Sequence, residues 1–274
     1  MLDVRVLSRA REGAAHDFLQ QSPYENVFLD WLIATDRSAI TRAGLYECAD
    51  ERGAIHGIAF FGRQVVIATD GASAVDAFAR HGSLQSQERM IVGPRKQVER
   101  YWSQVREHRG PPRLVRESQP LLVVDAGVLR GCSDGVFVRR AEPGDLPAVV
   151  KNSADMIAQE LRYDPRERDG AFAANVRQMI ERRLWWVGVR EGRPCFFCHA
   201  GPRNDRTIQL QGIWTPPHLR RRGLAAAALY GVARQLLDEA PTLSLYVNGD
   251  NEPALQLYAK LGFKPAGEFA TVLF

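Results

Sequence analysis

Apolar and polar residues follow one another along the chain in a pattern that predicts the same succession of elements twice. Apolar residues recur three or four positions apart where helices are expected, and they alternate or run together over short stretches where strands are expected. In residues 24–35, for example, Val27, Trp31 and Leu32 supply an apolar helix face. Each half is thereby predicted to follow the order β-α-α-β-β-β-α-β-α-β-β, and this recurrence supports the assignment more strongly than any single element does.

The first succession of elements covers the N-terminal half. Strands are expected at residues 2–7, 43–48, 55–61, 65–68, 90–92, 113–117 and 121–124. Helices are expected at residues 14–21, 24–35, 72–80 and 94–105. The segment Asp50-Glu51-Arg52-Gly53 separates two of the apolar runs as a hairpin turn, and Pro94 stands where a helix can begin.

The second succession covers the C-terminal half. Strands are expected at residues 136–140, 184–189, 194–199, 207–215 and 243–247, then around Phe263 and at 269–274. Helices are expected at residues 146–161, 171–182, 223–239 and 254–261. Asp145 can cap the first of these helices, because its carboxylate accepts hydrogen bonds from free backbone N–H groups.

A segment with little periodic pattern, residues 125–135, separates the halves and contains three glycines. We therefore predict two domains, residues 1–128 and residues 134–274, each of ordinary domain size. Each is expected to be an α/β unit in which helices flank a mixed, mostly antiparallel sheet.

Composition and charge narrow the class of protein. The chain has 274 residues and a formal net charge of +4, but its arginines are scattered among acidic residues and form no long basic block. Specific nucleic-acid binding is therefore not expected. No charged and then apolar leader precedes the first elements, and no uncharged stretch is long enough to span a bilayer. These features predict a cytoplasmic protein without a membrane partner.

The cysteines do not predict a metal site. Cys195 and Cys198 have the spacing of half a zinc ribbon, but the chain has no second pair of this kind among its four cysteines. We expect reduced thiols, no bound metal, and a buried strand at these two positions.

An arginine-rich turn joins an expected strand to an alanine-rich helix, with the sequence Arg220-Arg221-Arg222-Gly223-Leu224-Ala225. Free N–H groups and the positive end of the dipole make a helix N-terminus a binding site for anions. Small residues at positions 223 and 225 let phosphate oxygens approach the backbone. An ordinary basic helix start is the alternative, but arginines there oppose the helix dipole unless an anion is expected. The turn therefore predicts a pyrophosphate site.

The last expected helix carries a second pattern. Asn251 suits the N-cap, Pro253 suits the first turn, and Gly262 stands where a helix end favours a left-handed residue. Asn251 and Tyr258 are two helical turns apart and project toward one side. Simple packing of Tyr258 in the apolar stripe of the helix is the alternative to a functional role.

The strand, the arginine-rich turn and the helix from Asn251 to Tyr258 together resemble the acyl-CoA-binding core of the GNAT superfamily of N-acetyltransferases. The resemblance is strong in the C-terminal half and extends to the N-terminal half only in element order. It implies tandem GNAT-like domains, each with a sheet splayed at its centre. The N-terminal copy is expected to be degenerate, because Thr69-Asp70-Gly71 stands in place of the turn and Asp70 would repel a pyrophosphate.

The resemblance implies that acetyl-CoA binds as the acyl donor. The backbone of the entering strand would bind the pantetheine arm, and the turn would bind the pyrophosphate. The donor-binding residues implied in this way are Ile213, Trp214, Thr215, Arg220, Arg221, Arg222, Gly223, Leu224, Ala225, Ala226, Asn251 and Tyr258. Tyr258 would also be catalytic, because its phenol could donate a hydrogen bond or a proton to the departing thiolate.

The acceptor side departs from the family pattern. Many relatives carry a glutamate base on the entering strand, where this chain has Gln209 and Gln211, and neither amide can take a proton. Loss of the amine proton through ordered water is therefore the expected route. Glu160, Trp185 and Gln211 are the residues expected to contact the acceptor.

The leading hypothesis is an N-acetyltransferase in which an amine attacks the thioester directly, without a covalent enzyme intermediate. The acceptor would be a small-molecule amine or a protein amine, and a homodimer is one option for the assembly. Two alternatives stay open. One is a non-catalytic tandem protein that senses CoA or binds a protein, and the other is a tandem acetyltransferase similar to mycothiol synthase.

Overall fold

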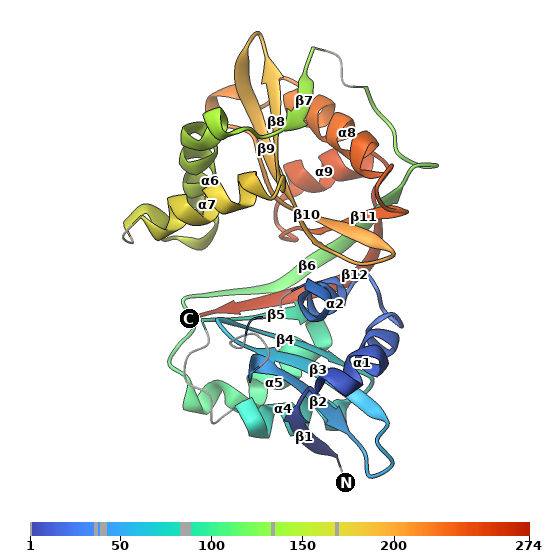
Figure 1. Cartoon of the computed structure of the whole chain (residues 1–274). Coiled ribbons are helices and arrows are strands. Elements are labelled where there is room, and N and C mark those ends of the chain that lie inside the picture. The colour runs from blue at the N-terminus through green and yellow to red at the C-terminus, as the bar shows by residue number, and fades with distance from the viewer. Residues whose placement is uncertain (1, 36–37, 39–42, 83–88, 133–134, 168–169) are drawn as a thin grey trace.

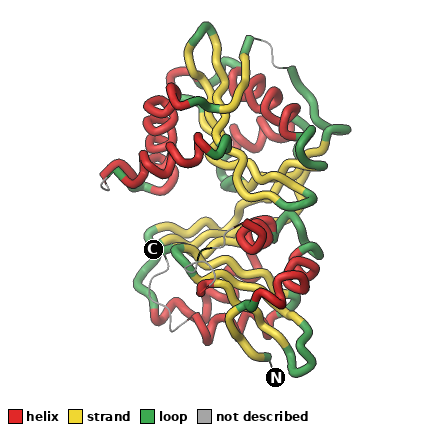
Figure 2. The backbone as a smooth tube through the Cα atoms, in the orientation of Figure 1, coloured by secondary structure: helices red, strands yellow, loops and turns green. Residues whose placement is uncertain are grey.

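A single sheet of 12 strands runs through the part of the chain that the structure describes, and helices cover both of its faces (Figures 1 and 2). The structure is a computed structural model that describes residues 2–35, 38, 43–82, 89–132, 135–167 and 170–274. The strand order is β1-β2-β3-β4-β5-β12-β6-β11-β10-β9-β8-β7. Apart from the two central strands, β12 and β6, strands of the N-terminal half lie on one side of the sheet and strands of the C-terminal half on the other.

The N-terminal half forms the expected elements up to its last strands. Its strands are Asp3–Val6 (β1), Leu45–Ala49 (β2), Ile55–Phe61 (β3), Gln64–Thr69 (β4), Met90–Pro94 (β5) and Leu114–Asp125 (β6). Its helices are Glu12–Leu19 (α1), Val27–Thr35 (α2), Ala72–Gly82 (α4) and Arg95–Val105 (α5). The helices bury one face each; on α5, for example, Val98, Tyr101 and Val105 are buried.

The C-terminal half repeats this order. Its strands are Phe137–Arg140 (β7), Trp185–Arg190 (β8), Arg193–Arg203 (β9), Thr207–Trp214 (β10), Thr242–Tyr246 (β11) and Lys264–Leu273 (β12). Its helices are Leu146–Leu161 (α6), Ala171–Glu181 (α7), Leu224–Leu236 (α8) and Glu252–Lys260 (α9). Cys195 and Cys198 lie in β9 and are buried, which confirms the expected buried strand.

The prediction of two closing strands in each half is wrong, because each half ends in one long strand, β6 or β12. Pro120, Pro265 and Gly267 are residues that often interrupt a strand, but β6 and β12 continue through them. The register between β6 and β12 shifts between Pro265 and Gly267 and again between Phe269 and Thr271. Such irregularities are where a strand accommodates glycine and proline without ending.

The two halves exchange their last strands. β12, from the end of the chain, pairs with β5 of the N-terminal half through residues 269–273 and 90–94. β6 pairs in turn with β11 of the C-terminal half through residues 121–125 and 242–246. β6 and β12 also pair with each other and cross the middle of the molecule together (Figure 1). The predicted linker, residues 125–135, therefore begins at the end of β6, a strand that is already paired with the C-terminal half.

Each face of each half has its own apolar core. In the C-terminal half, α8 and α9 pack on one face around Leu229 and Phe263, and α6 and α7 pack on the other around Val149 and Val187. In the N-terminal half, α4 and α5 cover one face, and α1 and α2 cover the face that continues toward the C-terminal half. None of the described helices is long and apolar enough to cross a membrane.

Candidate functional site

The neighbouring parallel strands β10 and β11 separate partway along their length. They pair only over residues 207–209 and 242–244, whereas β10 continues to Trp214 and β11 to Tyr246. Their outer edges are paired with β9 and β6. The inner edge of β10 therefore offers unpaired backbone groups to an extended ligand at the expected pantetheine-binding residues 213–215.

The arginine-rich turn forms an open loop in front of α8. Arg221 and Gly223 both have left-handed backbones, with φ of 61° and 76°. The first helical hydrogen bond runs from the N–H of Ala227 to the carbonyl of Gly223 at 3.1 Å. Within the described chain, no backbone carbonyl accepts a hydrogen bond from the N–H groups of residues 221–226. Such a run of free N–H groups at a helix N-terminus suits an anion.

The arginines of the loop fall into two kinds. Arg220 turns back toward β10, where its guanidinium lies 4.4 Å from the centroid of the Trp214 ring and its Nε donates to the carbonyl of Thr215 at 3.0 Å. Arg221 and Arg222 are exposed, and neither side chain has an ion pair among the residues that the structure describes. Arg220 thus fixes the loop to the end of the strand, while the other two arginines leave their charge available to an anion.

The helix α9 has the capping residues that the sequence predicts, although it covers Glu252–Lys260 and not residues 254–261. The side-chain oxygen of Asn251 accepts a hydrogen bond from the N–H of Ala254 at 3.3 Å, and Pro253 lies in the first turn. Gly262 follows the helix with φ of 94°. A Cβ at Gly262 would also collide with the carbonyl oxygen of Val128, so both backbone conformation and space require glycine there.

Tyr258 lies on the same face of the sheet as the loop. It is 6% exposed, and it belongs to the core cluster that contains Leu224, the first residue of α8. Burial raises the pKa of the Tyr258 phenol above its ordinary value, and nearby Cys198 and Glu160 add to this effect. The phenol therefore stays protonated at neutral pH and can act as a hydrogen-bond or proton donor.

A cavity of about 880 Å³ opens beside the loop, and we call it the donor-side cavity. It is lined by residues 114–118 of β6, by the end of α6 and by residues 248–251 after β11. Gln159 links it to the loop, because its side-chain oxygen accepts a hydrogen bond from Arg220 Nη2 at 3.4 Å. Asn251 lines this cavity as well, so one of the predicted donor-binding residues borders it directly.

Glu160 is held in the wall of the donor-side cavity. Its Oε2 accepts hydrogen bonds from Arg116 Nη2 at 2.8 Å and from Asn248 Nδ2 at 3.0 Å. Asn248 Oδ1 accepts in turn from Gln119, whose own side-chain oxygen accepts from Thr271 at 2.6 Å. The network ties α6 to the exchanged strands β6 and β12. The structure thus places Glu160 beside the loop and not in the cavity that contains Gln211.

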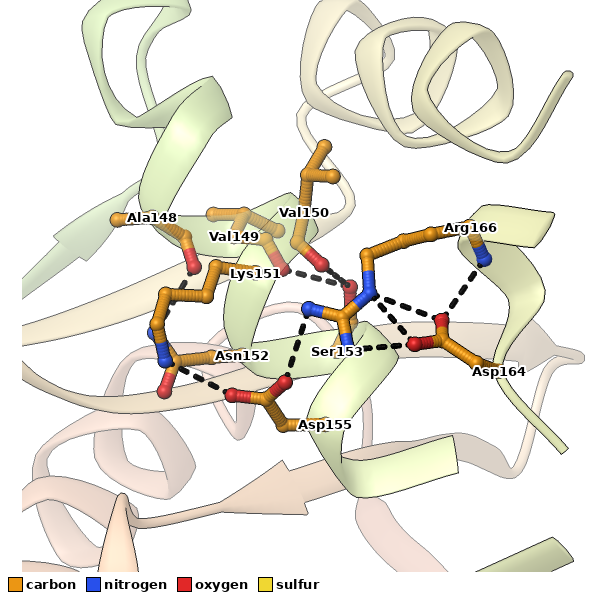
Figure 3. A network of polar contacts seen from close by, with 9 residues as sticks. All are labelled: Ala148, Val149, Val150, Lys151, Asn152, Ser153, Asp155, Asp164 and Arg166. Carbon is orange, nitrogen blue, oxygen red and sulfur yellow. Dashed lines mark hydrogen bonds and ion pairs between the residues drawn. The ribbon is translucent and has the colours of Figure 1, made fainter. Parts of the chain in front are cut away.

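The turn after α6 is fixed by a separate polar network (Figure 3). The guanidinium of Arg166 contacts Asp155 at 3.0 Å and Asp164 at 2.7 Å, and Lys151 donates to Asp155 at 2.8 Å. Exposed pairs of this kind contribute only about 0–1 kcal/mol each. Their main effect is to orient the turn that follows Gln159 and Glu160.

A second cavity, of about 350 Å³, lies where the two halves meet, and we call it the interdomain cavity. Gln209 and Gln211 line it from β10, and Tyr246 lines it from β11. Leu210 and Leu245 alternate with these residues and pack into the core around Tyr258. The interdomain cavity is therefore on the face of the sheet opposite to the loop, and it reaches the region where β10 and β11 separate.

The interdomain cavity also contains His199, which the sequence did not single out as a site residue. Burial lowers the pKa of this imidazole to about 4, so the ring is neutral at neutral pH. Its Nδ1 is buried without a hydrogen-bond partner among the described residues. The ring of Trp185 packs against it, with 4.8 Å between the ring centroids.

The two adjacent tryptophans are both buried. Trp185, one of the three expected acceptor residues, is 3% exposed, Trp186 is 2% exposed, and both lie in apolar cores. They can both be buried because the two faces of β8 are each covered by helices. Of the three expected acceptor residues, only Gln211 lines the interdomain cavity.

The N-terminal half has the strand separation but a different turn. β4 and β5 pair only over residues 64–65 and 90–91, so they diverge as β10 and β11 do. Asp70, in the turn before α4, is 2.8 Å from the Nδ1 of His56. A carboxylate at this helix start disfavours an anion, in agreement with the degenerate copy expected from the sequence.

The described residues contain no group of three or more His, Cys, Asp or Glu side chains arranged to hold a metal ion.

A splayed sheet with an arginine-glycine loop before a helix is the arrangement seen in the C-terminal half. Residues 153–263 of this half match the family model described as Acetyltransferase (GNAT) family. Residues 44–149 match a second model, described as a domain of unknown function, DUF4081.

Among individual proteins, the chain is similar to the Mycothiol acetyltransferase of Amycolatopsis mediterranei. The two are 30% identical over 146 residues, which cover 47% of this chain and 46% of that protein. The match thus spans about half the length of the curated relative.

Solved structures share the fold along the whole chain. A GCN5-related N-acetyltransferase from Sphaerobacter thermophilus matches with a TM-score of 0.59 and 16% identity, over 99% of this chain and 94% of that one. A tandem GNAT protein from the clavulanic acid biosynthesis pathway matches with a TM-score of 0.58 and 13% identity, over 99% and 98%. These likenesses confirm the predicted fold class, a tandem of GNAT-like units.

The sequence alone missed the part of the interdomain cavity that comes from the N-terminal half. Glu25, in the turn before α2, and Phe28 and Trp31, in α2, line it together with residues of β10. The apolar helix pattern marked two of these residues only as a packing face. No local signal could have identified the cavity, because it exists only where the two halves pack together.

Proposed function

We propose that the protein transfers an acetyl group from acetyl-CoA to an amine acceptor. The main support is the loop of residues 221–226, whose free N–H groups and exposed arginines suit a diphosphate, in a domain of the GNAT family. A pantetheine arm that extends from this loop along residues 213–215 would deliver the thioester to the place where β10 and β11 separate.

The separation of the strands would let the donor and the acceptor meet from opposite faces of the sheet. The amine lone pair attacks the thioester carbonyl carbon, and a backbone N–H near Trp214 stabilises the developing oxyanion. The C–S bond then breaks, and its electron pair leaves on the sulfur. The Tyr258 phenol, on the loop face, donates its hydrogen bond or proton to this thiolate, and the nitrogen of the amide product releases its extra proton to water.

A mycothiol-type acceptor is a second candidate, supported by the likeness to the Amycolatopsis protein. It would use the same donor site and the same attack on the thioester, and would differ only in the molecule that carries the amine. A non-catalytic CoA-binding protein would share the donor site but would release no CoA.

Thermal melting with acetyl-CoA, followed by an assay of thiol release with an amine panel, tests the proposal. A ligand at roughly 100 times its Kd adds about 2.7 kcal/mol of stability, so a clear rise in Tm is expected. Arg222→Glu should abolish most of this rise because it places a negative charge at the diphosphate site.

The matched control is Arg206→Glu, an equal charge change at an exposed position in the turn between β9 and β10. It should keep the shift. Absence of any shift in the unmodified protein would contradict acetyl-CoA binding. A shift without thiol release for any amine would leave a CoA-binding protein and end the transferase proposal.

A further inference from the structure

The interdomain cavity has the features of a built ligand site on the face of the sheet that faces away from the loop. Its volume of about 350 Å³ lies within the range of small-molecule sites, roughly 300–1,000 Å³. Phe28, Trp31 and Phe269 give it apolar walls, and Gln211 brings it to the strand separation. A molecule bound here could therefore reach a thioester held between β10 and β11.

Glu25 is the one carboxylate among the described residues that line this cavity. Its side chain is half-buried, and it has no hydrogen bond or ion pair with the rest of the described chain. The carboxylate rests on β12 at Gly267, where a Cβ would come within 2.8 Å of Oε1. Glycine at this position thus leaves the room that the carboxylate occupies.

The segment that carries Glu25 is fixed against the C-terminal half. The side chain of Asn204, in the turn between β9 and β10, donates to the carbonyl of Pro23 at 3.0 Å. The buried side chain of Asn26 donates to the carbonyl of Leu19 at 3.0 Å. These two hydrogen bonds hold the residues on either side of Glu25, and α2 packs directly on β9 and β10.

None of the other charged or titratable groups described in the lining of the cavity forms an ion pair with the Glu25 carboxylate. Arg182 is exposed at the rim, His199 is a neutral buried imidazole, and burial keeps the Tyr246 phenol protonated by raising its pKa. Burial also raises the pKa of Glu25 above its ordinary value. An ionised, half-buried carboxylate without a partner costs free energy unless a cation pairs with it. A carboxylate whose pKa is raised also accepts a proton more readily.

His199 lines the same cavity, and its Nδ1 is buried without a hydrogen-bond partner among the described residues. The imidazole thus adds a neutral polar group to the apolar walls.

We propose that the interdomain cavity binds the acceptor as a primary ammonium on a compact, uncharged apolar body, and that the Glu25 carboxylate holds this ammonium and accepts its proton. The inference rests on the proposed acetyl transfer. Glu25 would be the general base that β10 does not provide. One proton moves from the ammonium nitrogen to a Glu25 oxygen, which frees the lone pair that attacks the thioester. After CoA has left, Glu25 releases this proton to water and is ionised again.

Binding is tested without the acetyl donor. Calorimetry with phenethylamine, and with 2-phenylethanol as its uncharged counterpart, compares the unmodified protein with Glu25→Gln. We expect phenethylamine to bind the unmodified protein and to lose roughly tenfold or more in affinity to the variant. The alcohol should not distinguish the two proteins. Equal affinity of the amine for both proteins, or no binding to the unmodified protein, would overturn the proposal.

Two further variants separate this role from a loss of folding. Glu25→Gln removes a carboxylate whose pKa is raised, and such a group destabilises the fold above its unfolded pKa, so the Tm of this variant should stay equal or rise. Gly267→Ala keeps the charge but crowds Oε1, and it should weaken phenethylamine binding. Gly13→Ala, where nothing lies within 4 Å of the added Cβ, is its control and should leave binding unchanged.

Turnover distinguishes failure of this inference from failure of the proposed transfer. With acetyl-CoA, Glu25→Gln should lower kcat/KM for the amine by about 10²–10⁴-fold, should leave acetyl-CoA affinity unchanged, and should recover activity as rising pH deprotonates the amine. If Glu25→Gln binds acetyl-CoA and keeps its kcat/KM, the proposed role of Glu25 is wrong, while the proposed transfer is unaffected. No acetyl-CoA binding at all would refute the transfer, while the phenethylamine result would stand by itself.

Discussion

Tyr258 is a packing residue for which we also propose a chemical role. Its ring is buried in the core beneath α8 and α9, and the same burial raises the pKa of its phenol. A phenol that cannot easily ionise is poorly suited to accept a proton. It is well suited to donate one to a thiolate, whose conjugate thiol has a pKa near ~8.5.

Replacing Tyr258 by phenylalanine tests this role. Tyr258→Phe keeps the ring in the core, so the Tm should change little, while kcat should fall by about 10²-fold because the leaving thiolate loses its donor. Acetyl-CoA affinity should stay within roughly twofold. Steady-state kinetics and thermal melting check this. Since the phenol is protonated up to its raised pKa, the unmodified enzyme should not lose activity through Tyr258 as pH rises from neutral toward about 9. Unchanged kcat in the variant would remove Tyr258 from the mechanism.

The loop and helix α8 work as one element. The loop has left-handed backbones at Arg221 and Gly223 and successive N–H groups without a backbone partner in the described chain, and the helix dipole adds positive potential at the same point. Arg220 attaches this loop to Thr215 and Trp214, so the proposed diphosphate site and the edge of β10 keep a fixed relation.

Gly223→Val tests whether the shape of the loop matters. A β-branched residue is strained at φ of 76°, so stability should fall by about 1–3 kcal/mol, and acetyl-CoA affinity should fall by roughly tenfold or more. Gly53→Val is the matched control, because Gly53 has φ of 82° and open space around it in a hairpin of the N-terminal half. It should lose similar stability but keep acetyl-CoA affinity. Equal affinities in the two variants would argue against the loop as the binding element. Calorimetry and urea unfolding supply both quantities.

The exchange of β6 and β12 makes the two halves one structural unit. β12 completes the N-terminal side of the sheet, and β6 lies between β12 and β11. The hydrogen bonds from Thr271 through Gln119 and Asn248 to Glu160 extend this connection to the donor-side cavity. A C-terminal half produced without β6 would expose the edge of β11 and the apolar surface beneath it.

Unfolding therefore should be cooperative for the full chain, with coincident urea transitions by tryptophan fluorescence and far-UV circular dichroism. A fragment of residues 134–274, the predicted second domain, should not show a native-like transition or bind acetyl-CoA. A fragment of residues 114–274, which adds β6, should regain part of both properties. A sharp transition of the shorter fragment at the midpoint of the full chain would show that the exchange does not couple the halves.

The repeated order of elements, the arginine-glycine loop and both caps of α9 follow from the sequence by itself. Period-3.6 and period-2 patterns, a helix start at Gly223, an N-cap at Asn251 and a left-handed Gly262 are local consequences of backbone and side-chain chemistry. They need no knowledge of distant contacts. The resemblance to the GNAT superfamily rested on these same local features, and for this reason it could be recognised before the fold was known.

Only the tertiary structure decided how the halves combine and what they enclose. Neither the exchange of β6 and β12, nor the position of Glu160 beside the loop, nor the burial of both Trp185 and Trp186 leaves a local trace in the sequence. Glu25 reaches the cavity that contains Gln211 across the contact between the halves. Such relations depend on which surfaces pack together, and packing is set by the whole folded chain and not by the neighbours of a residue along it.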